Sequence, residues 1–432
     1  MEVTVVGAGL VGCLLACYLA RRGHEVTLYE RRADPREAGA ERGRSINLAI
    51  SERGIDALRR LGLDGEVLAE ALPMPGRMMH AIDGTLSFQP YSADGRRAIN
   101  SISRGELNRK LLDAAEAMPG VRVHFGHRLT GIDDGVLTFD TPQGPVTSGK
   151  TPVVIGADGA YSAVRAKLQT QPGVDFSQSY LDYGYKELSV PARYGDFAFD
   201  PGALHIWPRG RSMMIALPNP DRTFTCTLFW PHEAFDALDT PEKVRRHFAE
   251  HYPDAAEAMP GLADDYAANP VGNLVTMRCS PWHRTIGPTT IGLVGDAAHA
   301  IVPFYGQGAN CGFEDCVELD RCLDETGDDF PAALALFERR TADTEVIARL
   351  ALDNFVEMRD KVGSRTFLAG KRVEHALERV LPGRYASRYE LVSFSTTPYS
   401  EVERRIARQR RWVAGAGLGV AALVALALRR GK

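Results

Sequence analysis

The chain has 432 residues, of which 44% are apolar and 25% are charged, and its formal net charge is −4. This length predicts two or three domains in an ordinary globular protein, and the charge gives no basis for binding nucleic acid. The seven cysteines lack the spacing of metal ligands, so we expect reduced thiols, no metal site and a catalytic body in a reducing, cytoplasmic compartment.

The N-terminal segment has the pattern of a nucleotide-binding turn. An apolar strand runs into Gly7, Gly9 and Gly12, spaced as G-x-G-x-x-G, and a helix and a second strand ending at Glu30 follow. Gly7 permits the tight turn, Gly9 lets a pyrophosphate approach the backbone, and Gly12 allows the helix to pack closely on the sheet. The helix N-terminus attracts phosphate, and a carboxylate at Glu30 suits ribose hydroxyls. These features predict dinucleotide binding.

The middle of the chain contains a predicted helix, then strands of alternating polar and apolar residues, and then a continuous apolar strand. Residues 51–70 are expected to form one amphipathic helix with Ser51 as its N-cap. From about residue 176, short alternating runs predict an antiparallel sheet: Tyr183–Val190, Ala203–Trp207, Ser212–Leu217 and Thr223–Trp230. A continuous apolar strand then returns at Thr290–Val294, and helices are expected over 312–324, 331–361 and most of 366–411.

Two acid-bearing turns indicate that the dinucleotide is a flavin. Asp158 follows an apolar strand in an Asp-Gly turn, and Asp296 follows another in a Gly-Asp turn. A glycine-rich loop containing Gly308 and Asn310 comes next, followed by a helix. A carboxylate at a strand end can bind ribityl hydroxyls, and helix N–H groups can face the flavin pyrimidine edge, where charge accumulates on reduction. We therefore predict tightly bound, non-covalent FAD.

These segments predict an α/β fold: a Rossmann-like FAD-binding domain with a β-sheet substrate domain inserted, plus C-terminal helices. The FAD-binding domain is expected to be discontinuous, the substrate domain mostly antiparallel sheet, and the tail a separate apolar helix. The FAD-binding domain is predicted to comprise residues 1–70 with 100–175 and 285–330, and the substrate domain residues 71–99 with 176–284. The helical region is predicted over 331–411 and the tail helix over 412–428.

The three motifs, in this order, resemble the single-component FAD-dependent aromatic hydroxylases. Longer strings resemble the kynurenine 3-monooxygenase family within that group, among them residues 43–49 (GRSINLA), 204–209 (LHIWPR) and 306–316 (GQGANCGFEDC). The similarity runs from residue 3 to about residue 360, and more weakly through Tyr389. The resemblance implies FAD contacts at Glu30, Arg44, Arg104 and Asp296.

The resemblance also implies an amino-acid substrate, L-kynurenine. Arg77 corresponds to the arginine that pairs with the carboxylate, a role suited to a planar guanidinium fork. The other implied pocket residues are Asn354 and Tyr389, with Phe304 and Gln307 on the loop beside the flavin ring. The family usually carries a tyrosine shortly before the segment that ends at Arg104, and residues 98–100 contain none. Tyr91 is a candidate replacement.

The implied reaction uses NADPH and O₂ to hydroxylate the ring of L-kynurenine at its 3-position through a flavin hydroperoxide, a step of tryptophan degradation. No side chain is expected to act as acid or base, because the substrate amino group activates the ring and the flavin supplies the chemistry. The chain has no second GxGxxG, so NADPH is expected as a transient co-substrate. Two alternatives remain: a hydroxylase of another aromatic acid, and a membrane flavoprotein dehydrogenase. The sequence is compatible with a homodimer.

The tail differs from the rest of the chain. Residues 412–428 contain no charge and lie between Arg410-Arg411 and Arg429-Arg430. As a helix this segment would span about 25 Å, close to the lower limit for crossing a bilayer. A membrane anchor is the favoured interpretation; an interfacial helix and a helix docked on the protein are the alternatives.

Overall fold

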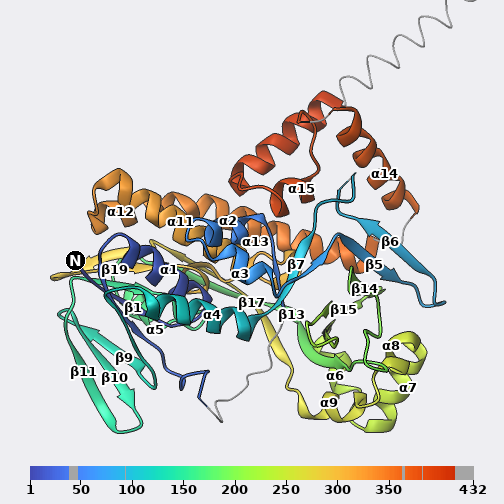
Figure 1. Ribbon diagram of the computed structural model, residues 1–432, viewed down its shortest axis with the longest axis horizontal. Helices are drawn as coiled ribbons and strands as arrows, with labels where there is room; N and C mark the ends of the chain where they lie inside the picture. The colour runs from blue at the N-terminus through green and yellow to red at the C-terminus, as the bar shows by residue number, and fades with distance from the viewer. Residues whose placement is uncertain (38–46, 93, 362–364, 382, 414–432) are drawn as a thin grey trace, which may run out of the picture.

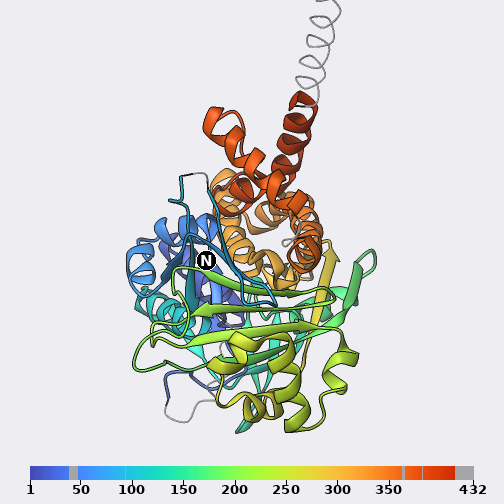
Figure 2. The same cartoon turned by 90° about the vertical axis from the view of Figure 1, so that its right-hand side faces the viewer.

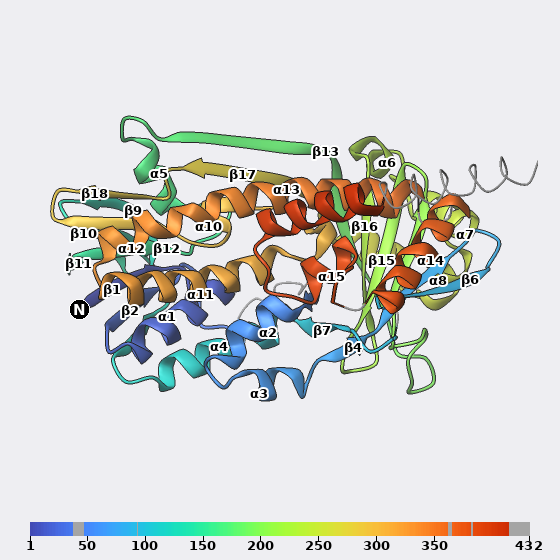
Figure 3. The same cartoon turned by 90° about the horizontal axis from the view of Figure 1, so that it is seen from above.

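The computed structural model describes residues 1–37, 47–92, 94–361, 365–381 and 383–413. It confirms the predicted α/β class (Figure 1). The described residues form a six-stranded sheet, a seven-stranded sheet and two three-stranded sheets. Helices pack around the six-stranded sheet and along one side of the molecule, as Figure 3 shows from above.

The six-stranded sheet carries the nucleotide-binding turn. Its strands, in spatial order, are β18 (His283–Ile286), β19 (Thr289–Leu293), β12 (Val153–Gly156), β1 (Glu2–Val6), β2 (Glu25–Tyr29) and β8 (Val121–His124). The strands from β19 to β8 are parallel, so their carboxyl ends lie along one edge. Gly7, Asp158 and Asp296 each come within three residues of such an end. The topology therefore gathers the three predicted motifs at one edge of the sheet.

Two layers enclose this sheet around a continuous apolar core. On one side the helices α1 (Leu10–Arg21), α4 (Arg104–Ala117), α11 (Gly308–Thr326) and α12 (Phe330–Phe337) pack on one another. On the other, α5 (Ala163–Gln169) contacts β12 and a small sheet made of β9 (Arg128–Asp133), β10 (Val136–Thr141) and β11 (Gly144–Lys150).

The expected single helix over 51–70 is wrong in its length. The segment forms two short helices, α2 (Glu52–Arg59) and α3 (Asp64–Leu68). Gly62 separates them with φ +73°, a left-handed conformation that ends a helix. Ser51 is the N-cap residue of α2, as predicted, but its side chain makes no capping hydrogen bond. Its hydroxyl accepts a bond from Gln307 Nε2 instead, at 3.3 Å.

The seven-stranded sheet contains all four predicted antiparallel runs. Its order is β17 (Gly272–Ser280), β13 (Asp175–Val190), β16 (Phe224–Trp230), β15 (Ser212–Pro218), β14 (Leu204–Arg209), β5 (Gly76–His80) and β6 (Leu86–Pro90). The long strands β13 and β17 run beside each other from one half of the molecule to the other (Figure 3). The second three-stranded sheet, β3 (Asn47–Ile50), β7 (Ile99–Ser103) and β4 (Leu72–Met74), lies where the halves meet.

Each face of the seven-stranded sheet has its own cover. One face packs on short helices: α6 (His232–Asp236), α7 (Pro241–His251), α8 (Pro253–Ala258) and α9 (Leu262–Ala268). The other packs on η1 (Pro303–Tyr305) and the C-terminal helices. The expected helix over 331–361 is interrupted: α12 is followed by η2 (Glu338–Arg340), α13 (Thr341–Val356) and the π-helical turn η3 (Glu357–Lys361).

The remaining described residues form a helical group at one end of the molecule (Figure 2). It comprises α14 (Arg365–Val380), α15 (Arg388–Ser393) and a helix over 399–413. None of the helices in these described ranges is long and apolar enough to cross a membrane. Of the predicted tail helix, residues 414–428 lie outside the described residues.

All seven cysteines are free and buried. Burial raises the pKa of every thiol: to about 12 for Cys17, to about 11 for Cys279 and Cys322, and further for the other four. These thiols are therefore protonated side chains of the core.

Candidate active site

A cavity of about 410 Å³ lies between the motif-bearing sheet edge and the seven-stranded sheet. Predicted residues of both kinds line it: Gly9, Arg104, Asp296 and Gly308 from the cofactor set, and Arg77, Asn354, Tyr389, Phe304 and Gln307 from the substrate set. The structure thus brings the substrate residues together with four cofactor residues. Among the other cofactor residues, Arg44 lies outside the described residues.

The GxGxxG turn leaves an open face toward this cavity. Gly7 has φ +102°, and a Cβ there would lie 2.6 Å from the carbonyl oxygen of Ala157. A Cβ on Gly12 would lie 1.9 Å from the carbonyl oxygen of Gly7, so both glycines are required by packing. A Cβ on Gly9 would meet nothing within 4 Å. Gly9 is also the N-cap residue of α1, and because it has no side chain it cannot cap the first N–H groups of that helix. This open helix N-terminus suits a pyrophosphate.

Glu30 lies beside the same turn at the end of β2. Its Oε2 accepts a hydrogen bond from the Ala8 N–H at 3.0 Å, and its Oε1 accepts one from Arg32 Nε at 2.8 Å. Although burial opposes ionisation, these bonds hold the pKa of Glu30 below its usual value. An ionised carboxylate at this position can accept ribose hydroxyls.

Asp158 has a different geometry from the one expected of a ligand. Its carboxylate accepts hydrogen bonds from Ser162 Oγ and from the backbone N–H groups of Ala163 and Val164, at the start of α5. The cavity is lined instead by its neighbours Ala157, Gly159 and Ala160. Asp158 therefore stabilises the Asp-Gly turn through its bonds to the start of α5.

Asp296, in contrast, faces the cavity. Its side chain is exposed to this space, while protein surrounds it on its other sides. Burial raises the pKa of Asp296, and the nearby charge of Arg104 opposes that rise. Arg104 lines the same cavity. A carboxylate held in this way can accept hydrogen bonds from a polyol.

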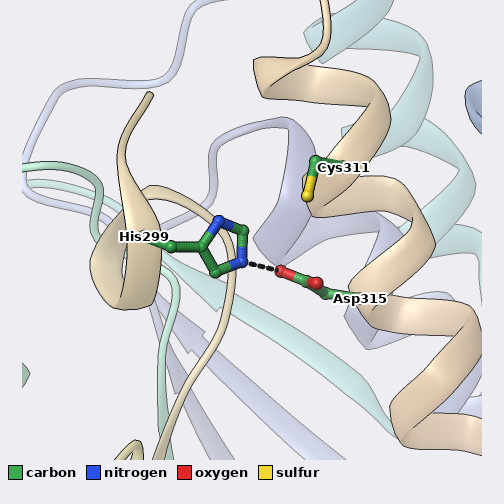
Figure 4. A group of neighbouring side chains, drawn as sticks. All are labelled: His299, Cys311 and Asp315. Atoms are coloured by element: carbon green, nitrogen blue, oxygen red, sulfur yellow. Dashed lines mark hydrogen bonds and ion pairs between the residues drawn. The ribbon is translucent and has the colours of Figure 1, made fainter. Parts of the chain in front are cut away.

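A buried ion pair holds the Gly-Asp turn in place. Asp315 Oδ2 accepts a hydrogen bond from the Gly295 N–H at 2.9 Å. The same oxygen accepts one from His299 Nε2 at 2.6 Å, which Figure 4 shows as a dashed line. Arg340 Nη2 lies 3.0 Å from the other carboxylate oxygen. Asp315 is fully buried, and His299 and Arg340 hold its pKa below the usual value although burial opposes this. The network fixes Gly295, and with it the direction of Asp296.

His299, Cys311 and Asp315 lie close enough together to be considered as metal ligands, since their potential ligand atoms are within 4.8 Å of one another. The Arg340 guanidinium already contacts this group, with Nη2 3.5 Å from Cys311 Sγ and 3.0 Å from Asp315. A cationic side chain bound there favours an ion-pair network over a metal centre.

The glycine-rich loop is fixed by polar contacts from two directions. Gln307 Oε1 accepts a hydrogen bond from the Tyr399 hydroxyl at 2.9 Å, while its Nε2 donates to Ser51. The side chain of Asn310 is buried: its Oδ1 accepts from the Ser51 N–H, and its Nδ2 donates to the carbonyl groups of Ala49 and Gly306. Asn310 thus positions the loop, whereas Gln307 reaches the cavity wall.

Arg53 links this loop to the C-terminal segment. Its guanidinium is completely buried, forms an ion pair with Glu314 and donates to the carbonyl groups of Val392 and Thr397. The guanidinium carbon lies 3.8 Å from the ring centroid of Tyr399. The C-terminal residues that hold Gln307 are therefore themselves anchored on α2 and α11.

The substrate end contains buried polar groups without partners among the described residues. Arg77 is 8% exposed, and its Nε has no hydrogen-bond partner. The hydroxyl of Tyr91, a buried residue, also has none. The rings of Tyr91 and Tyr389 stack with centroids 4.7 Å apart, and the Arg77 guanidinium lies 4.8 Å from the Tyr389 centroid. A buried, always charged guanidinium beside a free hydroxyl is suited to bind a carboxylate.

Apolar and aromatic side chains form the adjoining wall. Phe304 stacks on Phe355 with centroids 4.0 Å apart and meets Phe229 edge-on at 5.0 Å. The side chain of Asn354 donates from Nδ2 to the Phe304 carbonyl at 2.7 Å, which fixes this part of the loop. The wall can hold a planar ring.

The family comparisons agree with this geometry. The sequence profile of the FAD binding domain matches residues 1–329. Kynurenine 3-monooxygenase of Myxococcus xanthus (strain DK1622) is 50% identical over 405 residues, covering 92% of this chain and 86% of the relative. The enzyme of the same name from Sus scrofa is 41% identical over 430 residues, covering 98% and 90%. The chain belongs to the kynurenine 3-monooxygenase family.

Solved structures show the same fold at lower identity. A tetrameric 2-methyl-3-hydroxypyridine-5-carboxylic acid oxygenase has a TM-score of 0.66 at 22% identity, covering 86% of this chain and 96% of that one. P. aeruginosa PqsL in complex with 2-aminobenzoylacetate has a TM-score of 0.68 at 20% identity, covering 86% and 99%. This member of the kynurenine 3-monooxygenase family is an FAD-dependent aromatic monooxygenase.

The sequence identifies Tyr91 only as a candidate replacement for a missing tyrosine. The tyrosine expected near residues 98–100 is absent there, and the structure places Tyr91 beside Arg77. The two residues are neighbours across the β5–β6 hairpin, in which Arg77 pairs with Gln89. An Asp83-Gly84 turn between two short extended runs is a hairpin signal that would have located Tyr91.

Proposed function

We propose that this chain hydroxylates L-kynurenine at the 3-position of its aromatic ring, using FAD as bound cofactor and NADPH and O₂ as co-substrates. The observation that carries this proposal is the pairing of Arg77, which lines the cavity, with Tyr91, whose ring stacks on Tyr389 of the same lining. Both residues are buried, and Arg77 Nε and the Tyr91 hydroxyl have no hydrogen-bond partner among the described residues. Such a site suits an amino acid that has a carboxylate at one end and an aromatic ring at the other.

Arg77 would bind the substrate carboxylate through its guanidinium, and the Tyr91 hydroxyl would donate to the same carboxylate. Tyr389 and Asn354, which also line the cavity, would enclose the amino-acid group. A buried guanidinium without an anion is costly, so binding a carboxylate relieves a cost already present in the free protein. This arrangement selects amino acids over neutral aromatic compounds.

The aromatic part of the substrate would lie against the apolar wall. Phe304 is held by its stacking on Phe355 and by Asn354, so it provides a fixed surface for the ring. Met213, Ile215 and Leu217 of β15 line the same cavity. These side chains exclude water from the ring carbon that reacts. Because the substrate amino group already activates that carbon, we propose no protein acid or base.

FAD would occupy the part of the cavity lined by Gly9, Arg104, Asp296 and Gly308, with its pyrophosphate at the N-terminus of α1. The observed features fit it: open space at Gly9 and at Gly308, and a carboxylate at Asp296 that faces the cavity. FAD, when bound, supplies the activation of oxygen. Gly7, Gly12, Asp158 and Asn310 would hold the surrounding backbone in shape, and Glu30 would bind the ribose.

The test uses purified holoenzyme mixed with NADPH in air, with and without L-kynurenine. Stimulated NADPH oxidation together with a product one oxygen atom heavier than kynurenine is the expected result, with mass spectrometry as the readout. NADPH oxidation that yields only hydrogen peroxide, or electron transfer to a quinone without an oxygenated product, would overturn the proposal.

The tail would attach this catalytic body to a lipid bilayer. Its support is in the sequence: residues 412–428 are uncharged and flanked by arginine pairs. Trp412, the first of them, is 58% exposed at the end of the helix over 399–413. Removing residues 412–432 should move the enzyme from the membrane fraction to the supernatant with its flavin retained. A full-length chain that appears in the supernatant without detergent would contradict the anchor.

The domain division predicted from the sequence remains a proposal that agrees with the sheets. β5 and β6 join β13–β17 in the seven-stranded sheet, and β1, β2, β8, β12, β18 and β19 form the six-stranded sheet. The proposed boundary at residue 285 falls inside β18. Limited proteolysis with mass mapping tests the division, and cuts inside β13 or β19 before any cut between the domains would contradict it.

A further inference from the structure

A second cavity of about 320 Å³ adjoins the first. The two share four lining residues, Arg77, Tyr305, Asn354 and Tyr389. Two of the four shared residues are tyrosines. Tyr389 stacks on both Tyr91 and Tyr305, with ring centroids 4.7 and 5.7 Å away. We call the second cavity the outer chamber and the first the inner cavity.

The outer chamber differs from the inner cavity in its charge. Its lining includes three arginines from the C-terminal helical group, Arg372, Arg388 and Arg410, and the acids Asp353, Glu357 and Glu374. In the inner cavity the charged lining residues are Arg77, Arg104 and Asp296. No ion pair of Arg372, Arg388 or Arg410 occurs within the described part of the chain, although other arginines of that group, such as Arg404 and Arg408, pair with Glu401.

A chamber lined both by carboxylates and by arginines that form no ion pair within the described part of the chain matches a ligand that carries both charges. An α-amino acid has a carboxylate and an ammonium group on one carbon, and the volume lies within the range of small-molecule sites. Arg77, to which we have assigned the substrate carboxylate, lines the chamber at the wall that it shares with the inner cavity. The charged end of the ligand would therefore meet arginines in sequence, first at the C-terminal helices and then at the shared wall.

We propose that the outer chamber is a docking site where L-kynurenine first binds by its charged amino-acid group before its ring passes Tyr389 into the inner cavity. This inference rests on the proposed function. Arg388 immediately precedes Tyr389 on α15, a helix of six residues. The same short element thus presents an arginine to the chamber and a ring to the wall.

The test follows association of L-kynurenine with the oxidised holoenzyme by stopped flow, without NADPH, through the change in flavin absorbance. The variants are Arg388→Ala, Arg410→Ala and their double variant. We expect the association rate constant of the double variant to fall about tenfold and its dependence on salt to weaken, since charges at the rim of a site act on encounter. The flavin spectrum of the bound complex should stay that of the wild type.

Matched controls distinguish the effect of the arginines that line the outer chamber from the effect of any lost surface charge. Arg128→Ala removes an arginine whose side chain is 66% exposed on β9, away from both cavities, and should associate as the wild type does. Arg388→Lys keeps the charge and should restore most of the rate. The decarboxylated amine analogue of kynurenine should lose its sensitivity to the arginine variants.

Three results would overturn the proposal. One is an association rate and salt dependence in the double variant equal to those of the wild type. Another is a change in the NADPH concentration needed for flavin reduction with kynurenine association unaltered, because the chamber would then take the phosphates of the dinucleotide. If L-kynurenine fails to perturb the wild-type flavin at all, the proposed substrate itself is wrong, and the docking site fails with it.

Discussion

The buried polar groups near the two ends of the inner cavity differ in whether they have hydrogen-bond partners within the protein. At the Gly-Asp turn, Asp315 is bonded to Gly295, His299 and Arg340 within the protein. At the shared wall, Arg77 Nε is buried and has no partner among the described residues, and the same holds for the hydroxyl of Tyr91, whose ring stacks on Tyr389 of that wall. The Asp315 carboxylate therefore has its hydrogen-bond partners within the protein, whereas Arg77 Nε and the Tyr91 hydroxyl can bind the proposed substrate.

This difference separates residues that position from residues that bind. Substitution of a satisfied buried ion costs stability, because it leaves the partner charges unpaired. Substitution of an unsatisfied buried group costs binding and leaves stability unchanged or improved. The variants below compare the two ends by measuring unfolding and ligand binding on the same protein.

The largest effect is expected at Asp315. Asp315→Ala leaves His299 and Arg340 without their shared carboxylate and should lower the free energy of unfolding by about 3–5 kcal/mol. Urea denaturation measures it, and flavin content should fall because Gly295 is released. Glu233→Ala, which breaks an exposed pair with Arg211, should cost less than about 1 kcal/mol. Equal losses in both variants would contradict a structural role for the buried network.

Arg77→Ala should show the reverse pattern. The dissociation constant for L-kynurenine should rise by about 100-fold, or roughly 3 kcal/mol, because charge-assisted bonds to the carboxylate are lost. Thermal unfolding should be unchanged or shifted upward, since a buried cation is removed. Titration of the flavin absorbance gives the constant, and the flavin spectrum of the free enzyme serves as the control. An unaltered dissociation constant would remove Arg77 from the site.

Tyr91→Phe removes a hydroxyl and keeps the ring stack with Tyr389. Loss of one bond to the carboxylate should raise the dissociation constant about tenfold, or roughly 1.4 kcal/mol. The same titration measures it. Tyr194→Phe, at a residue that is 96% exposed, is the control and should have no effect. A stability loss in Tyr91→Phe with unchanged binding would show that the hydroxyl has an internal partner.

The smallest effect is expected at Tyr399. Tyr399→Phe keeps the ring beside Arg53 but leaves Gln307 Oε1 without its donor, which should cost about 1 kcal/mol of stability. A looser loop should admit water, so a larger share of NADPH electrons should appear as hydrogen peroxide while the kynurenine dissociation constant stays within about twofold of the wild type. Flavin fluorescence and peroxide yield are the readouts. An unchanged peroxide yield would mean that this hydrogen bond does not position the loop.

The sequence predicted those parts of the fold that depend on local pattern. The GxGxxG turn, the apolar strands and the alternating strands of the second sheet follow from spacing and periodicity. The helix over 51–70 failed because its apolar pattern continues through Gly62, where the backbone turns left-handed. Periodicity reports which face is buried, and it does not report where a helix stops.

The sequence motifs predicted which segments form the candidate site. They did not predict which residues of those segments face the cavity and which hold the backbone. Asp158 and Asp296 occur in similar turns, yet the first caps α5 and the second faces the cavity. Asn310 lies in the predicted loop but is occupied by backbone groups of β3 and the loop itself. Which carboxylate or amide is free depends on partners distant in sequence, such as Ser51 for Asn310, and only the folded chain supplies them.

The burial of all seven thiols has a consequence for oxidant tolerance. Hydrogen peroxide attacks thiolates, and an enzyme of this class releases peroxide near its own side chains whenever turnover is uncoupled. Because burial keeps every cysteine protonated at neutral pH, the protein offers this oxidant no thiolate. The cysteines of this protein should therefore be oxidised more slowly during uncoupled turnover than exposed thiols would be.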